Sequence, residues 1–377
     1  MFSRRRKSYR LSTSNGPVDI SMLVAVILLV IFGLIMVYDS SVVQAFKDFG
    51  DKYLYIKQQL IWVFLGLGAM WFFSKLDYSF LRQIALPFFV VSVILLLAVL
   101  IPGLGVNVGG AHRWLKIGPA TIQPTEIIKL ASIIFFAALF DSGKSLWGKN
   151  SKLGPFALSV GLISFVIGIL QKDLGSTIVF FLTSLSIYVV AGAPLNYLMG
   201  LIPFSLLGFI IFALTSDYRK HRILAFLDPF SDPQGYSYHI SQVLIALGSG
   251  GLFGLGLGQS RQKYEYIPEV TTDSIFAIVG EEFGFIGGVV LISLISYLVL
   301  RGFKIAQGTT DPFGKLLAAG LTIWLGIQAV VNLAAMVSLI PLTGVPLPFI
   351  SYGGSALLVN LVAVGILLNI SKSAKIG

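Results

Sequence analysis

The chain has 377 residues, of which 56% are hydrophobic and only 12% are charged, about half the charged share of an average soluble protein. Its net charge of +10 is spread along the chain, so the sequence does not predict a nucleic-acid-binding protein, and the absence of cysteine excludes disulfides and thiolate chemistry. Several apolar runs reach the ~20 residues that a helix needs to cross a bilayer. The sequence therefore predicts an all-α polytopic membrane protein.

Ten apolar segments predict about ten transmembrane helices, with a large extracytoplasmic loop between helices 7 and 8. They lie at about residues 20–38, 57–74, 80–101, 124–140, 155–170, 175–192, 196–215, 275–300, 316–338 and 353–370. The first is too long for a signal-peptide core and reads as an uncleaved span. An even number of spans puts both termini on one side, which carries about 15 of the 27 basic residues and is therefore predicted to be cytoplasmic.

This topology divides the chain into three parts. Residues 1–19 form a basic cytoplasmic tail, residues 20–371 the membrane domain with its loop at about 216–274, and residues 372–377 a second cytoplasmic tail. We expect the protein in the cytoplasmic (inner) membrane of a bacterium.

The fourth span and the loop before it carry candidate binding residues. Glu126 and Lys129 lie three residues apart, so they share a helix face and can pair. A charged pair in a membrane helix needs a partner or water, which leaves two interpretations: a structural ion pair, or a polar cavity in which Lys129 binds a phosphate. Arg113, beside the interfacial Trp114, is a further candidate for an anionic ligand.

The turn between the fifth and sixth spans contains Asp173, followed by Gly175 and Ser176. Its carboxylate can cap the next helix, and it can also orient a substrate hydroxyl.

The long loop of residues 216–274 is basic although it is predicted to lie outside. Long loops escape the orientation rule, so its charges are either tolerated or form a patch for an anionic ligand, with Arg222, Arg261 and Lys263 as candidates. Its glycine-rich segment 248–258 fits either an anion-binding backbone or a tightly packed re-entrant segment.

The densest group of charges begins in this loop and ends in a hydrophobic helix, with Asp273 at the junction. A carboxylate placed where water thins out has a raised pKa and a raised basicity, so Asp273 is the candidate general base; N-capping of the helix is the structural alternative. Glu281 and Glu282 are costly inside a membrane helix, and we expect one of them to meet Lys129 or Arg222.

The segment of residues 340–355 holds three prolines and three glycines and cannot continue a helix. Such backbone is tolerated at membrane depth only inside protein or beside a wet cavity. Rigidity alone explains the prolines, whereas Ser351 and Tyr352 add polar groups that suit a substrate.

Several of these segments, in this order, resemble the SEDS family, the shape, elongation, division and sporulation proteins FtsW, RodA and SpoVE. The matching motifs are RWLKIGPATIQPTEIIKL, QKDLGST, FLDPFSDPQGYSYHISQ, YIPEVTTDSIFAIVGEEFGFIG and GVPLPFISYGGSALL. The motifs GLGLGQSRQKY and VGGAHRWLKIGP resemble the division branch, FtsW, more than the elongation branch. Family members commonly have histidine at the position of Thr271 and proline at the position of Lys172, which leaves open any role of a histidine beside the base.

The resemblance implies a peptidoglycan glycosyltransferase that polymerises lipid II into glycan strands on the outer face of the membrane, during cell division or elongation. It puts the family's key aspartate at Asp273 and its fourth-span pair at Glu126 and Lys129. It also implies lipid II, a class B penicillin-binding protein and other divisome proteins as partners, and no nucleic acid. The predicted substrate-binding residues are Arg113, Glu126, Lys129, Asp173, Arg222, Arg261, Lys263, Ser351 and Tyr352.

Two points stay open at this stage. No cofactor is certain, and a divalent cation, Mg²⁺ or Mn²⁺, is an alternative means of holding the pyrophosphate; the metal ligands are unknown. The rival functions are a lipid II flippase without glycosyl transfer, which an amphipathic cavity around Lys129 would suit, and a scaffold that only recruits its penicillin-binding partner.

Overall fold

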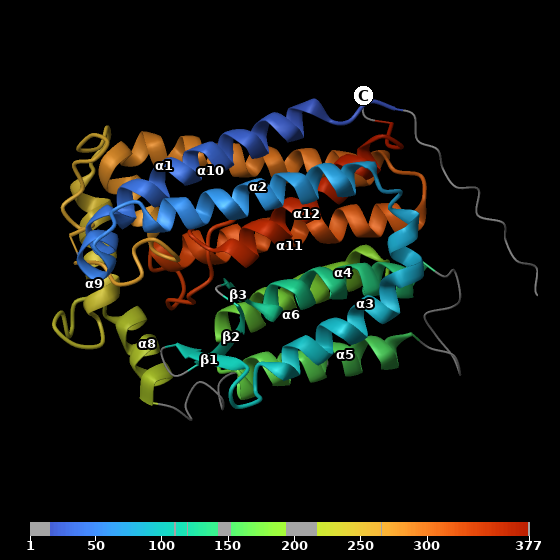
Figure 1. The fold of residues 1–377 in the computed structure, drawn as a ribbon, viewed down its shortest axis with the longest axis horizontal. Coiled ribbons are helices and arrows are strands. Elements are labelled where there is room, and N and C mark those ends of the chain that lie inside the picture. Colours follow the sequence, from blue (N-terminus) through green and yellow to red (C-terminus); the bar gives the residue numbers. More distant parts are fainter. Residues whose placement is uncertain are drawn as a thin grey trace, which may run out of the picture.

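The computed structural model describes most of the chain, with short gaps (Figure 1). The described residues are 16–108, 111–118, 120–141, 152–193, 217–264 and 266–375. The seventh predicted span, residues 196–215, lies outside them, as do most of the predicted N-terminal tail and the last two residues of the C-terminal tail.

Long helices run side by side and form the body of the molecule (Figure 1). Their bounds are α1 (Ile20–Phe49), α2 (Leu54–Lys75), α3 (Ser79–Ala98), α4 (Pro124–Asp141), α5 (Leu153–Phe165) with the π-helix η1 (Val166–Leu170), α6 (Leu174–Val190), α10 (Ile275–Gly308), α11 (Pro312–Met336) and α12 (Gly354–Ser371). Within the described residues, seven segments are long and apolar enough to cross a membrane, namely α1, α2, α3, α5 with η1, α10, α11 and α12. The prediction of an all-α polytopic membrane protein is confirmed.

The apolar helices differ in how much of their surface is buried inside the protein. The most apolar stretches of α11 and α12 are buried over 72% and 89% of their residues, whereas those of α2 and α3 are buried over only 22% and 28%. Large apolar side chains on α2, such as Phe64 and Trp71, are exposed, as a lipid-facing helix requires. Helix α11 packs against α4, α6 and α10, so it is the central helix around which the site is built.

The two ends of the described chain lie at the same end of the bundle (Figure 1). The backbone N–H of Asp19 donates to Ser371 Oγ at 3.1 Å, and Asp19 also pairs with Arg301 of α10. At this end Asn369 joins α12 to the turn after α2, because its amide donates to Ser74 O and accepts from Tyr78 N–H. These contacts hold Asp19 and the end of α12 at one end of the bundle, while the cytoplasmic location of both termini stays a prediction.

The opposite end carries the extramembrane segments. The segment of residues 217–274 contains α8 (Asp217–Leu227) and α9 (Tyr238–Ser249), which appear in yellow at the left of Figure 1. Beside α4 lies a small antiparallel sheet, β1 (Gly105–Val108), β2 (Ala111–Ile117) and β3 (Ala120–Ile122), in the order β1-β2-β3. No strand was predicted here from the sequence, because strands of three to seven residues give a weak alternation signal.

The glycine-rich segment packs on a kink in α10. Gly284 has a φ of 67° inside the helix, and the kink releases carbonyl groups of the preceding turn. The N–H groups of Leu255 and Gly256 donate to the carbonyls of Glu281 and Glu282, both at 3.0 Å. A Cβ at Gly254 would lie 2.1 Å from the carbonyl oxygen of Glu282. The tightly packed alternative is therefore supported for this segment, since these N–H groups already have acceptors.

Candidate active site

Asp273 lies in the loop directly before α10, at the end of the bundle opposite the chain termini. It is 6% exposed, and its Oδ1 accepts a hydrogen bond from Thr272 Oγ1 at 3.3 Å. The N-cap position of α10 belongs to Ser274, so the alternative that Asp273 caps the helix is wrong. The carboxylate is thus held in the loop and is not used to satisfy the helix backbone.

Burial is the main cause of the electrostatic state of Asp273. Removal from water raises the pKa of its carboxyl group above the usual value, while Arg222, the Thr272 hydrogen bond and Arg113 oppose the rise only in part. A carboxylate with a raised pKa accepts protons more readily than an exposed one. This agrees with the direction that the sequence predicted.

Arg113 reaches the site from β2. Its Nε lies 3.4 Å from Asp173 Oδ2, and its Nη2 donates to the backbone carbonyl of Lys172 at 3.2 Å. Asp173 in turn caps α6, because it accepts from the N–H of Ser176 at 3.1 Å and from its hydroxyl at 2.9 Å. The capping interpretation of Asp173 is confirmed, and the same carboxylate also orients Arg113.

The loop of residues 340–353 lies between these groups and Asp273. At Gly175 an added Cβ would lie 2.3 Å from the carbonyl oxygen of Thr343, so this loop sits directly on the start of α6. At Gly344 an added Cβ would lie 3.9 Å from Asp273 Oδ2. The loop therefore brings the start of α6, with Asp173 and its partner Arg113, next to the candidate base.

Arg222 reaches the same loop from α8. Its Nη1 donates to the carbonyl of Leu342 at 2.7 Å, and with Tyr236 it lines a small pocket between α8 and the loop. Arg222 is the charged group with the largest effect on the pKa of Asp273. Two of the predicted cations, Arg113 and Arg222, thus lower the pKa of the candidate base from two different elements.

Ser351 and Tyr352 lie at the C-terminal end of the loop of residues 340–353 and fix it by hydrogen bonds. The Tyr352 N–H donates to the carbonyl of Thr271 at 2.8 Å, and its hydroxyl donates to Gln58 Oε1 at 2.5 Å. Burial, followed by the neighbouring Tyr55, raises the pKa of Tyr352 to about 12, so its hydroxyl keeps its proton. Ser351 Oγ accepts from the N–H of Leu347, so this hydroxyl stabilises the turn in which it lies.

Glu126 and Lys129 form a closed ion pair inside the bundle. Lys129 Nζ lies 2.7 Å from Glu126 Oε1 and donates to Gln328 Oε1 at 3.0 Å, and it sits over the ring of Trp324. The two charged side chains are 2% and 1% exposed. Of the two interpretations left open by the sequence, the structure supports the ion pair, because the ammonium already has two acceptors.

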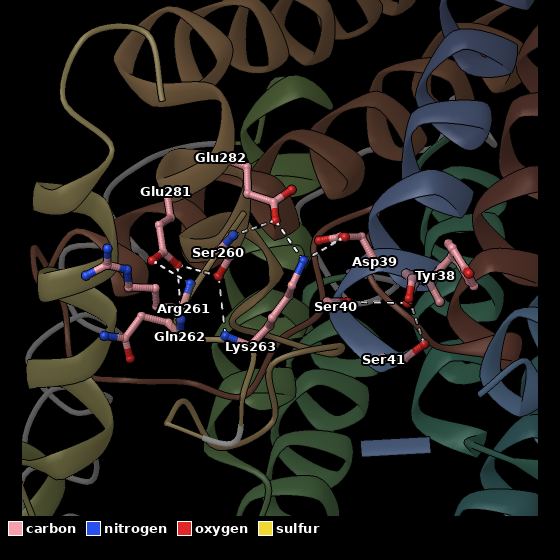
Figure 2. A network of polar contacts seen from close by, with 11 residues as sticks. Tyr38, Asp39, Ser40, Ser41, Ser260, Arg261, Gln262, Lys263, Glu281 and Glu282 are labelled. Atoms are coloured by element: carbon pink, nitrogen blue, oxygen red, sulfur yellow. Dashed lines mark hydrogen bonds and ion pairs between the residues drawn. The ribbon is translucent and has the colours of Figure 1, made fainter. Parts of the chain in front are cut away.

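Lys263 belongs to a second buried cluster, shown in Figure 2. Its Nζ lies 2.8 Å from Asp39 Oδ1 of α1 and 3.1 Å from Glu282 Oε1 of α10. Burial by itself lowers the pKa of Lys263, but the hydrogen bonds and charges of these two carboxylates raise it above the usual value. The candidate phosphate-binding lysine is therefore already neutralised by two carboxylates.

The same cluster corrects the expectation for the acidic pair of α10. Glu281 accepts from the Ser260 hydroxyl and from the N–H of Arg261 at 3.0 Å, whereas Glu282 accepts from the N–H of Ser260 at 3.0 Å (Figure 2). The expectation that one of them meets Lys129 or Arg222 is wrong. Both glutamates instead accept hydrogen bonds from the loop of residues 260–262, in which Arg261 and Gln262 each donate a backbone N–H to Glu281 and the Arg261 residue is exposed.

Three polar residues near Asp273 were missed by the sequence analysis. His239 Nε2 lies 2.7 Å from Ser274 Oγ, and burial, followed by the charge of Arg222, lowers the pKa of this histidine to about 4. Gln328 and Asn332 are buried on α11 and contact the site loops. Their spacing of four residues in an apolar helix was the available signal.

Among the residues that the structure describes, no group of three or more His, Cys, Asp or Glu side chains is arranged to hold a metal ion.

Comparison with known proteins decides the family. The model of the FtsW/RodA/SpoVE family, described as cell cycle protein, matches residues 19–376. The chain belongs to this family. It is 41% identical over 366 residues to the stage V sporulation protein E of Bacillus subtilis, which covers 97% of this chain and 100% of that protein. It is 40% identical over 359 residues to a probable peptidoglycan glycosyltransferase FtsW of Geobacter metallireducens, covering 95% of each.

Two solved structures share the fold. A chain of a peptidoglycan synthase complex that coordinates polymerization and crosslinking superposes with a TM-score of 0.77 at 26% identity, over 95% of this chain and 98% of that one. The rod shape determining protein RodA of Thermus thermophilus gives a TM-score of 0.70 at 26% identity, with the same coverage. The family membership predicted from the sequence motifs is confirmed.

Proposed function

We propose that this chain is a peptidoglycan glycosyltransferase that polymerises lipid II, with Asp273 as general base. The proposal is supported by the family, by relatives that are named probable peptidoglycan glycosyltransferases, and by one observation of the site. That observation is a buried carboxylate with a raised pKa, within the electrostatic influence of two arginines, at the end of the bundle away from the chain termini.

The chemistry follows from these groups. Asp273 takes the proton of the acceptor sugar hydroxyl, whose oxygen then attacks the anomeric carbon of the donor sugar from the face opposite the leaving group. A new carbon–oxygen bond forms, the bond to the lipid pyrophosphate breaks, and its electron pair leaves with the pyrophosphate. Arg113 and Arg222 are the cations that stabilise the charge on this leaving group.

Topology and partners complete the proposal. The end of the bundle that carries the chain termini faces the cytoplasm of a bacterium, and Asp273 faces the outside, in accordance with the distribution of lysine and arginine. The protein works with a class B penicillin-binding protein and other divisome proteins; the similarity to a chain of a peptidoglycan synthase complex supports the first of these. The relatives named FtsW support a role in cell division.

The test compares wild type with Asp273→Asn, which keeps the shape of the side chain and removes its basicity. Purified protein is incubated with labelled lipid II, with and without the penicillin-binding partner, and glycan chains are resolved on a gel. We expect chains from wild type, and a loss of about a hundredfold or more in Asp273→Asn. Asp228→Asn, which changes an exposed carboxylate in the loop after α8, is the matched control and keeps full activity.

Two outcomes contradict the proposal. Polymerisation by Asp273→Asn at the wild-type rate refutes the assignment of the base. Movement of lipid II across vesicle membranes without any glycan product from wild type supports the flippase alternative. The sequence suggested that alternative through a polar cavity around Lys129, but in the structure Lys129 is buried and paired with Glu126.

A further inference from the structure

Helix α11 presents a buried polar stripe toward the site. Trp324, Gln328 and Asn332 are four residues apart, so they lie on one face of the helix, and each is at most 1% exposed. Polar side chains buried in a membrane protein cost free energy unless they are hydrogen-bonded. Their partners therefore show what the stripe does.

Asn332 joins the two loops that form the site. Its Nδ2 donates to the carbonyl of Asp273 at 2.8 Å and to the carbonyl of Val345 at 2.8 Å. One amide group uses both of its hydrogens on two backbone carbonyls from segments far apart in sequence. The backbone of the candidate base is thereby fastened both to α11 and to the loop that faces the start of α6.

Gln328 makes the corresponding connection one turn earlier. Its Nε2 donates to the carbonyl of Pro346 at 3.2 Å, and its Oε1 accepts from Lys129 Nζ and from Trp324 Nε1, each at 3.0 Å. Lys129 in turn is paired with Glu126 at 2.7 Å. A continuous path of hydrogen bonds thus leads from the ion pair of α4 to the loop at residues 345–346, and Asn332 continues it to Asp273.

We infer that Asn332 and Gln328 are positioning residues for Asp273, and that the Glu126–Lys129 pair acts on the reaction through Gln328 and not by contact with substrate. The inference rests on the proposed function, because it assigns a role within the same reaction. The ion pair fixes the rotamer of Gln328, Gln328 and Asn332 fix the loop at residues 345–346, and Asn332 fixes the backbone of the base.

Position matters here because a general base works only within hydrogen-bond reach of the proton it takes, and a shift of about 1 Å can cost about a hundredfold in rate. Asn332→Leu removes both hydrogen bonds and keeps the branched shape and the number of heavy atoms of the side chain. We expect its kcat for lipid II polymerisation to fall about 10- to 100-fold while KM changes less than about twofold. Gln328→Leu is expected to act in the same direction.

Lys129 separates the positioning role from phosphate binding. If Lys129 acts through Gln328, Lys129→Met lowers kcat and leaves KM nearly unchanged, and Lys129→Arg restores much of the rate because a guanidinium can still donate to both Glu126 and Gln328. A rise in KM with unchanged kcat in Lys129→Met would instead assign this lysine to ground-state binding of the substrate and overturn the inference for the ion pair.

The matched control is Asn369→Leu. Asn369 is also a buried asparagine, which bonds Ser74 O at 2.9 Å and Tyr78 N–H at 3.0 Å, but it does so at the opposite end of the bundle. We expect it to lower the melting temperature as much as Asn332→Leu and to keep kcat. An equal loss of kcat in both variants would show that Asn332 acts only through general stability.

Hydrogen exchange gives a readout that does not depend on activity. In full-length protein, Asn332→Leu is expected to speed amide exchange at residues 271–275 and 343–347, and Asn369→Leu at residues 74–80 only. If Asn332→Leu does not fold, Asn332→Ser replaces it, since a hydroxyl has one hydrogen for two carbonyls. Unchanged exchange and full kcat in the Asn332 variant overturn the inference, whereas a wild type that makes no glycan refutes the proposed function alone.

Discussion

Asp273→Asn is expected to make the protein more stable while it lowers the rate of polymerisation by about a hundredfold or more. Burial raises the pKa of Asp273, so at neutral pH the folded chain holds a carboxylate in a place that disfavours its charge. Asparagine has the same shape and no charge, and its oxygen can still accept from the Thr272 hydroxyl that now bonds Asp273 Oδ1 at 3.3 Å. The substitution therefore removes an electrostatic cost and leaves the local contact.

The size of the gain follows from the pKa. Each unit by which the folded-state pKa exceeds the unfolded one corresponds to about 1.4 kcal/mol of unfolding free energy at a pH above both. Well below the ordinary value of 3.8 the wild-type carboxyl is protonated in both states, so the part of the difference that comes from its ionisation vanishes. The difference grows as the pH rises from this value to the folded-state pKa, and it is constant above the folded-state pKa.

The assay is thermal unfolding of the purified proteins in detergent, followed by tryptophan fluorescence between about pH 4 and about pH 8. Asp51→Asn serves as a control of opposite sign, since the hydrogen bond from Lys57 lowers the pKa of the exposed Asp51, and its ionised form is the favoured one. An Asp273→Asn protein that melts below wild type at neutral pH, or a gain that is the same at every pH, would refute the reasoning.

Two further predictions concern the charges around the site. Arg222→Gln removes the cation that most opposes the effect of burial on Asp273, so the pKa of the base rises further and the acid limb of the pH–rate profile moves to higher pH; an unmoved limb would show that the two groups do not interact. Lys263→Met leaves the buried Glu282 and the partly buried Asp39 without their cation (Figure 2), which is expected to lower the free energy of unfolding by about 3–5 kcal/mol. Thermal unfolding measures this loss, and an unchanged melting temperature would contradict it.

The first helix is longer than its hydropathy pattern predicts. The apolar run predicted a span of residues 20–38, whereas α1 continues to Phe49. Asp39 ends the apolar run in the sequence, but in the fold its carboxylate is neutralised by Lys263, which is 224 positions away. A charged residue that ends the apolar run in the sequence can therefore lie within the helix. No residue close to Asp39 in the chain predicts that Lys263 is its partner.

In the candidate site, too, some features followed from the sequence and others only from the fold. Asp273 was found from its position between a polar loop and an apolar helix, because burial at such a junction is a local property of the chain. The sequence treated Arg222 and Lys263 alike, as basic residues of one loop. The fold places Arg222 where it acts on the pKa of Asp273 and Lys263 where it neutralises two carboxylates.

The amino-acid sequence alone determined that the protein is a helical membrane protein, where most of its described helices lie, and to which family it belongs. These depend on hydropathy and on motifs that are contiguous in the chain. Only the tertiary structure decided which charged side chains pair with one another. Such pairs join segments that are distant in sequence, and in a low-dielectric interior the partner, more than the residue type, determines whether a lysine or a carboxylate is held inside the protein or is left to act on a substrate.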